Sequence, residues 1–86
     1  MKMAEQVSEL DFVINSLSEI QADATVPRNV RTKIEGILNT LKQDMEISIK
    51  INKSLNELDG IASDVNLQSY TRTQIWNAMS LLEKLH

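Results

Sequence analysis

Two aspartates and two arginines recur at one spacing along the chain and are its clearest candidates for chemistry. Asp23 precedes Arg31 by eight residues (31 − 23), and Asp64 precedes Arg72 by the same interval (72 − 64). Each arginine could hold its aspartate, or could donate to the carbonyl groups that end the preceding helix, and either contact would fix a loop. The functional alternative is a binding edge at which the N–H groups of a helix N-terminus hold an anion. The repetition favours the structural interpretation, because a duplicated fold has two loops to fix.

Basic residues are densest at Arg28, Arg31 and Lys33, which together with Arg72 could contact phosphates. The composition argues against nucleic acid as the main partner. The 86 residues carry a formal net charge of −3, and one Phe, one Tyr and one Trp offer no platform on which bases could stack. Nucleic-acid binding is therefore kept as the alternative function. A membrane-surface role is disfavoured too, because no predicted helix has a strongly basic polar face.

The residues needed for nucleophilic catalysis are missing from the sequence. It has no cysteine, and the one histidine, His86, is the last residue. Glu83 and His86 have the Glu-x-x-His spacing of helical di-iron sites, but such a site needs a second motif, and the position 41 residues earlier (86 − 41 = 45) is Met45. An enzyme would instead need carboxylates acting with a bound metal, and the available ones are Glu19, Asp23, Asp59 and Asp64. We expect no enzyme, no metal and no cofactor.

The stretch 73–82 carries no charged residue, which is unusual for a helix with one solvated face. Its candidate contact residues are Gln74, Trp76, Asn77, Met79 and Ser80. One interpretation places Trp76 in the core of the fold. The other places these residues in a homodimer or hetero-partner surface, because depletion of charge around Trp and Met is typical of interfaces.

Four apolar stripes with helical spacing must position these residues. They comprise Met3, Val7, Leu10, Ile14 and Leu17, widened by Phe12, Val13 and Ile20; Val30, Ile34, Ile37, Leu38 and Leu41; Ile47, Ile51, Leu55, Leu58 and Ala62; and Tyr70, Ile75, Met79 and Leu82. The stretch 46–51 alternates like a strand, but its helical spacing continues beyond the usual length of a strand, so we predict a helix. Pro27 suits the start of the second helix. The sequence predicts an all-α fold of four helices packed as a small bundle.

The two halves of the chain resemble one another when shifted by 41 positions (58 − 17). The shift pairs Leu17 with Leu58, Asp23 with Asp64, and Arg31-Thr32 with Arg72-Thr73. One αα-hairpin buries too little apolar surface to be stable alone, whereas two hairpins packed together share a core. We therefore predict one domain over 1–86, built from an internal repeat of about 4–42 and 45–83.

The segments 23–31 (DATVPRNVR) and 71–76 (TRTQIW) resemble the two signature regions of UPF0147, an uncharacterised archaeal family of small all-helical proteins. The resemblance covers nearly the whole chain. The sequence departs from the family pattern in the second loop, where no proline at Leu67 or Gln68 matches Pro27. The resemblance implies an archaeal cytoplasmic protein with no assigned activity.

The N-terminal residues show no secretory signal, and no stretch is apolar enough to span a bilayer, so we expect a cytoplasmic protein with no membrane contact. The leading hypothesis is a non-enzymatic module that acts through protein–protein contact, with a protein partner or with copies of itself. The alternative is an accessory nucleic-acid or ribonucleoprotein component that uses the basic cluster.

Overall fold

The computed structural model describes residues 2–85, with side-chain surroundings from residue 9 onward. Its four helices are α1 (Lys2–Ala22), α2 (Arg28–Lys42), α3 (Ile47–Ala62) and α4 (Ser69–Leu85). The all-α prediction is confirmed. The side chains of Met3 and Val7 and the whole of His86 lie outside the described part, so the expectations placed on them are not addressed.

The start of each later helix follows from its local hydrogen bonds. Pro27 has φ −54° and ψ 142° just before α2, and its carbonyl accepts from the Arg31 N–H at 3.1 Å. Gln68 takes the corresponding place before α4, and its carbonyl accepts from the Arg72 N–H at 3.0 Å. The missing proline in the second loop therefore leaves the helix start where the 41-residue shift puts it (28 + 41 = 69).

The alternating stretch 46–51 is helical, as the longer spacing predicted. The Glu46 carbonyl accepts from the N–H groups of both Ile49 and Lys50 at 3.1 Å. The Lys50 ammonium reaches back to the carbonyls of Leu41 at 3.1 Å and Gln43 at 3.3 Å. A cation at these C-terminal carbonyls satisfies acceptors that the end of α2 leaves open, and it fixes the turn between α2 and α3.

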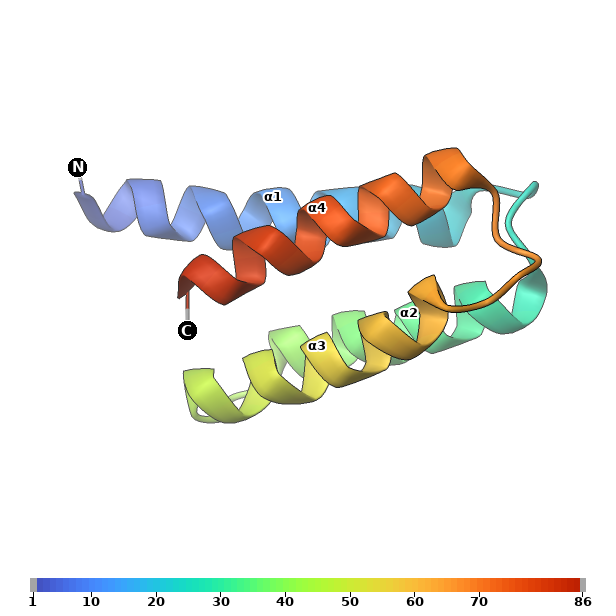
Figure 1. The fold of residues 1–86 in the computed structure, drawn as a ribbon. Coiled ribbons are helices and arrows are strands. Elements are labelled where there is room, and N and C mark those ends of the chain that lie inside the picture. Colours follow the sequence, from blue (N-terminus) through green and yellow to red (C-terminus); the bar gives the residue numbers. More distant parts are fainter. Residues whose placement is uncertain (1, 86) are drawn as a thin grey trace.

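The helices run up and down in a closed arrangement (Figure 1). α1 packs against α2 and α4, and α3 packs against α2 and α4. The two hairpins therefore form one bundle, with overall extents of 39 × 22 × 18 Å, rather than an open array. The loops after α1 and α3 lie at one end of the bundle, and both termini lie at the other (Figure 1).

The core is aliphatic and draws on all four helices. Its fully buried large side chains are Val13, Leu17, Ile20, Val30, Ile34, Ile37, Leu41, Ile51, Leu58, Ile75 and Leu82. Two loop residues, Val26 and Leu67, are also buried, and both lie at the end of the bundle where these two loops are found (Figure 1). The helical period of the sequence does not extend to either residue, so it predicts connections there and not core positions.

Three residues assigned to apolar stripes face solvent instead. Phe12 is 60 % exposed because its neighbour Val13 takes the inward position, one residue being about 100° around a helix. Tyr70 is 70 % exposed and Thr71 is buried in its place. Ile47, in the first turn of α3, is also exposed. The predicted stripes were therefore wider than the core that the bundle needs.

Candidate functional site

The loops that carry the repeated aspartates have the same turn. The Asp23 carboxylate accepts from the Thr25 N–H at 2.9 Å and from its hydroxyl at 2.7 Å. The Asp64 carboxylate accepts from the Asn66 N–H at 2.9 Å. These side chains complete Asx turns, in which a carboxylate replaces a backbone acceptor. The hydroxyl and N–H of Thr25 lower the pKa of Asp23 from its usual 3.8, because both donate to the charged form.

The two arginines donate to carbonyl groups. Arg72 donates from Nε to the Ala62 oxygen at 2.9 Å, and from Nη2 to the oxygens of Asp64 and Leu67 at 2.8 and 3.2 Å. Arg31 donates from Nε to the Val26 oxygen at 3.1 Å. Donation to a carbonyl that ends the preceding helix is present for Arg72, which ties Ala62 and two loop carbonyls to α4, whereas Arg31 reaches a carbonyl of its loop and none of α1.

Equivalent backbone bonds confirm that the two loops match locally. The N–H groups of Asp23 and Val26 donate to Ile20 and Asp23, and those of Asp64 and Leu67 donate to Ile61 and Asp64, all at 3.0–3.1 Å. Each donor and acceptor in one loop lies 41 residues from its counterpart in the other. An internal repeat of whole hairpins remains a prediction, as does any binding role of these loops.

The candidate phosphate-contacting residues do not form one cluster. Arg28 and Arg31 line a shallow depression of about 150 Å³ beside α1, together with the carboxylate-bearing Glu35. Lys33 lines a different depression, against α3. Arg72 is engaged with the carbonyls of its own loop. Arg28 and Arg31 thus share one depression with an acid, whereas Lys33 and Arg72 lie elsewhere.

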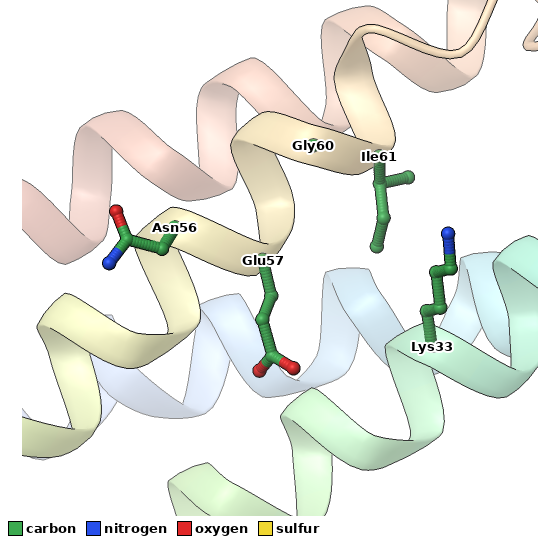
Figure 2. Close-up of a pocket in the computed structure, with 5 residues that line it drawn as sticks. All are labelled: Lys33, Asn56, Glu57, Gly60 and Ile61. Carbon is green, nitrogen blue, oxygen red and sulfur yellow. The ribbon is translucent and has the colours of Figure 1, made fainter.

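A groove between α2 and α3 was not foreseen from the sequence. It encloses about 290 Å³ and is lined by Lys33, Asn56, Glu57, Gly60 and Ile61 (Figure 2). Glu57 extends from α3 toward α2, and Lys33 extends from α2 toward the end of α3 (Figure 2). A Cβ at Gly60 would meet nothing within 4 Å. The one available signal was Gly60 itself, a residue that costs stability inside a helix.

Helix α4 presents a broad uncharged surface to solvent, which we call the α4 face. Its exposed residues are Tyr70, Thr73, Trp76, Asn77 and Ser80, and the exposed, charged Glu83 and Lys84 bound it toward the C-terminal end of α4. Trp76 is 54 % exposed, so the interpretation that it fills the core is wrong. Gln74 and Met79, the other two candidate contact residues, are partly buried at the edges of the face. The face extends over about 15 Å, the length of ten helical residues.

The corresponding surface of α2 is charged. At a shift of 41 positions, Trp76 corresponds to Glu35 and Gln74 corresponds to Lys33. Glu35 and Lys33 are both exposed. Two helices with the same place in their hairpins therefore present different surfaces. Contact with solvent does not require the α4 surface to be uncharged, because the corresponding position in α2 faces solvent with a charged residue.

The structure gives no support to the metal sites considered from the sequence. Among the side chains that the structure describes, residues 9–85, no three acidic or histidine side chains lie together as metal ligands would, so Glu19, Asp23, Asp59 and Asp64 do not form such a group. His86, the partner of Glu83 in the Glu-x-x-His spacing, lies outside the described residues. None of the four helices, over the described part of the chain, combines the length and apolar character that crossing a bilayer requires.

Comparison with known proteins gives consistent matches. Residues 1–85 match the model of the Uncharacterised protein family UPF0147. A UPF0147 protein of Archaeoglobus fulgidus is 38 % identical over 76 residues, which is 88 % of this chain and 87 % of the relative. One from Thermoplasma volcanium is 34 % identical over 86 residues, covering 99 % and 97 %.

Two crystal structures share the fold. A UPF0147 protein from Thermoplasma acidophilum superposes with a TM-score of 0.90 at 29 % identity, covering 94 % of this chain and 96 % of the other. The protein of unknown function MMP1188 superposes with a TM-score of 0.83 at 36 % identity, covering 90 % and 89 %. The family match along nearly the whole sequence, the archaeal relatives and the shared four-helix fold agree: the chain belongs to the uncharacterised family UPF0147.

Proposed function

We propose that this chain is a small, non-enzymatic, cytoplasmic module that binds protein through the α4 face. One observation carries the proposal: a tryptophan that is 54 % exposed lies in a stretch of ten residues, 73–82, without a charge. Exposed tryptophan is enriched at the energetic centres of interfaces, and charged residues are depleted there. Tyr70, which is 70 % exposed, extends the same surface by nearly one turn beyond Thr73.

The alternative, nucleic-acid binding, has less support. Arg28 and Lys33 are exposed and available, but they line separate depressions. Arg31 and Arg72 already donate to loop carbonyls. The protein carries a net charge of −3, so most of its surface would repel a phosphate backbone, and only a small area would attract one. We therefore treat nucleic-acid binding as an outcome that the test must be able to reveal.

The test is the apparent mass of the protein in native lysate, measured by size-exclusion chromatography with antibody detection. The proposal predicts elution above 9.7 kDa for the natural chain, in lysate kept concentrated enough for weak contacts to persist, and a lower mass for Trp76→Glu. Ile49→Glu is the matched control, because Ile49 on α3 is 53 % exposed and lies off the α4 face. A mass that Trp76→Glu leaves unchanged would refute the α4 face as the contact surface.

Nuclease and salt separate the two functions. A complex that collapses after nuclease, or that weakens steeply between about 50 and 200 mM salt, would support phosphate contacts instead. The non-enzymatic part of the proposal has its own test, a calorimetric titration with Mg²⁺, Mn²⁺ and Zn²⁺. Absence of uptake would remove an enzyme that acts through carboxylates and a bound metal, and stoichiometric uptake would favour it over a non-enzymatic module.

A further inference from the structure

We propose that the occupant of the α4 face is a second copy of this chain, so that two α4 helices pack antiparallel across a two-fold axis. This inference rests on the proposed function and names the partner. A two-fold interface brings the same surface patch of each copy together. The patch must therefore be complementary to itself, which restricts its chemistry more than binding to a different protein does.

The absence of charged residues from the α4 face meets this requirement. A carboxylate or an ammonium near a two-fold axis faces its own like charge, whereas hydroxyl and amide groups both donate and accept. All five exposed residues of the face are uncharged, although the chain as a whole carries a net charge of −3. A surface selected for a different, oppositely charged partner would gain specificity and association rate from charge. The α4 face has no charged residue with which to attract such a partner.

The spacing of the exposed residues fits a helix–helix contact. Thr73, Trp76 and Ser80 lie three and four residues apart, the spacing with which one helix packs along another. An antiparallel pairing centred between Trp76 and Asn77 places Thr73 opposite Ser80 of the second copy. It also brings the two Trp76 side chains together at the centre of the contact.

The hydrogen bonding within the chain suits that pairing. The Thr73 hydroxyl already donates to the Ser69 carbonyl of its own helix at 3.0 Å. It therefore presents an acceptor outward, and the Ser80 hydroxyl of the second copy can donate to it. The pair occurs twice across the two-fold axis. Such a contact specifies the register of the two helices, because a shift by one residue moves each hydroxyl to a different side of the helix.

The size of the face predicts weak association. A strip about 15 Å long and one helix wide buries less than the roughly 800 Å² per partner of standard interfaces. We expect a dissociation constant in the range of about 10 µM to 1 mM. The dimer should therefore be sought at high protein concentration, because a dilute sample reports the monomer.

The experiment is sedimentation equilibrium of the purified full chain over that range, read together with tryptophan emission. The chain has one tryptophan, so the emission reports Trp76 alone. The expected result is a mass that rises from 9.7 kDa toward twice that value, with a shift of the emission to shorter wavelength at the same midpoint. A monomer at every concentration would overturn the inference.

Variants assign the contact to the α4 face. Trp76→Glu should raise the dissociation constant by roughly 30-fold or more, the effect of losing a central aromatic residue. Ser80→Glu keeps the tryptophan reporter and should also weaken association, whereas the double variant Thr73→Lys/Ser80→Glu should recover it by pairing opposite charges across the axis. Ile49→Glu should change nothing. Dimers that survive both Trp76→Glu and Ser80→Glu would refute the α4 contact.

Failure of this inference differs from failure of the proposed function. A purified monomer, combined with a large complex in lysate that Trp76→Glu dissolves, would overturn self-association and leave protein binding by the α4 face intact. A lysate complex whose mass is unchanged by Trp76→Glu would instead show that the α4 face is not the contact surface in the cell. Circular dichroism of each variant shows that a change in mass does not come from unfolding.

Discussion

The unequal use of the two loop arginines predicts unequal losses of stability. Arg72 makes three hydrogen bonds to carbonyl oxygens at 2.8–3.2 Å, whereas Arg31 makes one at 3.1 Å. Hydrogen bonds with a charged partner contribute about 1.5–3 kcal/mol each when isolated. Both side chains are only partly buried and the bonds share one guanidinium, so we expect about 2–4 kcal/mol for Arg72→Gln and about 1 kcal/mol for Arg31→Gln.

Urea unfolding followed by far-UV circular dichroism measures both variants. One kcal/mol corresponds to about 4–8 °C in a domain of this size, so Arg72→Gln should lower the melting temperature by about 8–32 °C. Arg28→Gln, an exposed cation on α2, is the control and should stay within about 0.5 kcal/mol of the natural chain. If Arg31→Gln destabilised the bundle as much as Arg72→Gln, the number of carbonyl acceptors would not determine the loss of stability.

A double-mutant cycle identifies the acceptor. Arg72 contacts the backbone oxygen of Asp64, not its carboxylate. Asp64→Asn keeps a side-chain acceptor for the Asn66 N–H and leaves the backbone oxygen unchanged. The coupling between Asp64→Asn and Arg72→Gln should therefore be below about 0.5 kcal/mol, the usual limit of additivity. A larger coupling would mean that the carboxylate binds the guanidinium in solution.

Three further predictions concern stability. Ser54 has a fully buried hydroxyl without a partner, so Ser54→Ala should be neutral or stabilising by up to about 1 kcal/mol in urea unfolding, and a loss above that would mean that the hydroxyl is satisfied in solution. Gly60→Ala should stabilise α3 by about 0.5–1 kcal/mol, because the added methyl group meets nothing; a lower melting temperature would show that the groove is closed in solution. Leu67→Ala should lower the free energy of unfolding by about 2–5 kcal/mol, because Leu67 is buried. Val65→Ala, two residues away and 90 % exposed, is the control and should lower it by almost nothing. Equal effects would contradict the burial of Leu67.

The lowered pKa of Asp23 gives a prediction about pH. A carboxyl group whose pKa is lower in the folded state stabilises the fold above its unfolded pKa, near 3.8, and the stabilisation is lost as the pH falls through the folded value. The natural chain should therefore lose stability below about pH 4 more steeply than Asp23→Asn, which cannot titrate there. Parallel profiles of melting temperature against pH would refute the role of the Thr25 hydrogen bonds.

The sequence predicted most of the fold because helical spacing is a local property. The segment 47–62 shows this best: its start alternates like a strand, but Leu55, Leu58 and Ala62 continue at helical intervals, and α3 is what forms. Similarly, the 41-residue shift predicted equivalent loops, since the residues that build an Asx turn are close neighbours in sequence.

What the sequence could not decide depends on where other helices lie. Phe12 and Val13 are adjacent and both apolar, and only the position of the neighbouring helices determines that Val13 faces the core. Trp76 is exposed for the same reason. The groove between Lys33 and Glu57 joins residues from separate helices, so no spacing along the chain reveals it.

The contact between α1 and α4 has a consequence for how the chain folds. Three of the four helix–helix contacts join helices that follow one another directly, across connections of only a few residues. The fourth joins the two ends of the sequence and closes the arrangement. The entropic cost of closing a loop increases with its length, so we expect the hairpins to form first and the α1–α4 contact to form last. A chain dominated by such local contacts folds within microseconds to milliseconds, and substitutions between α1 and α4 should accelerate unfolding more than they slow folding.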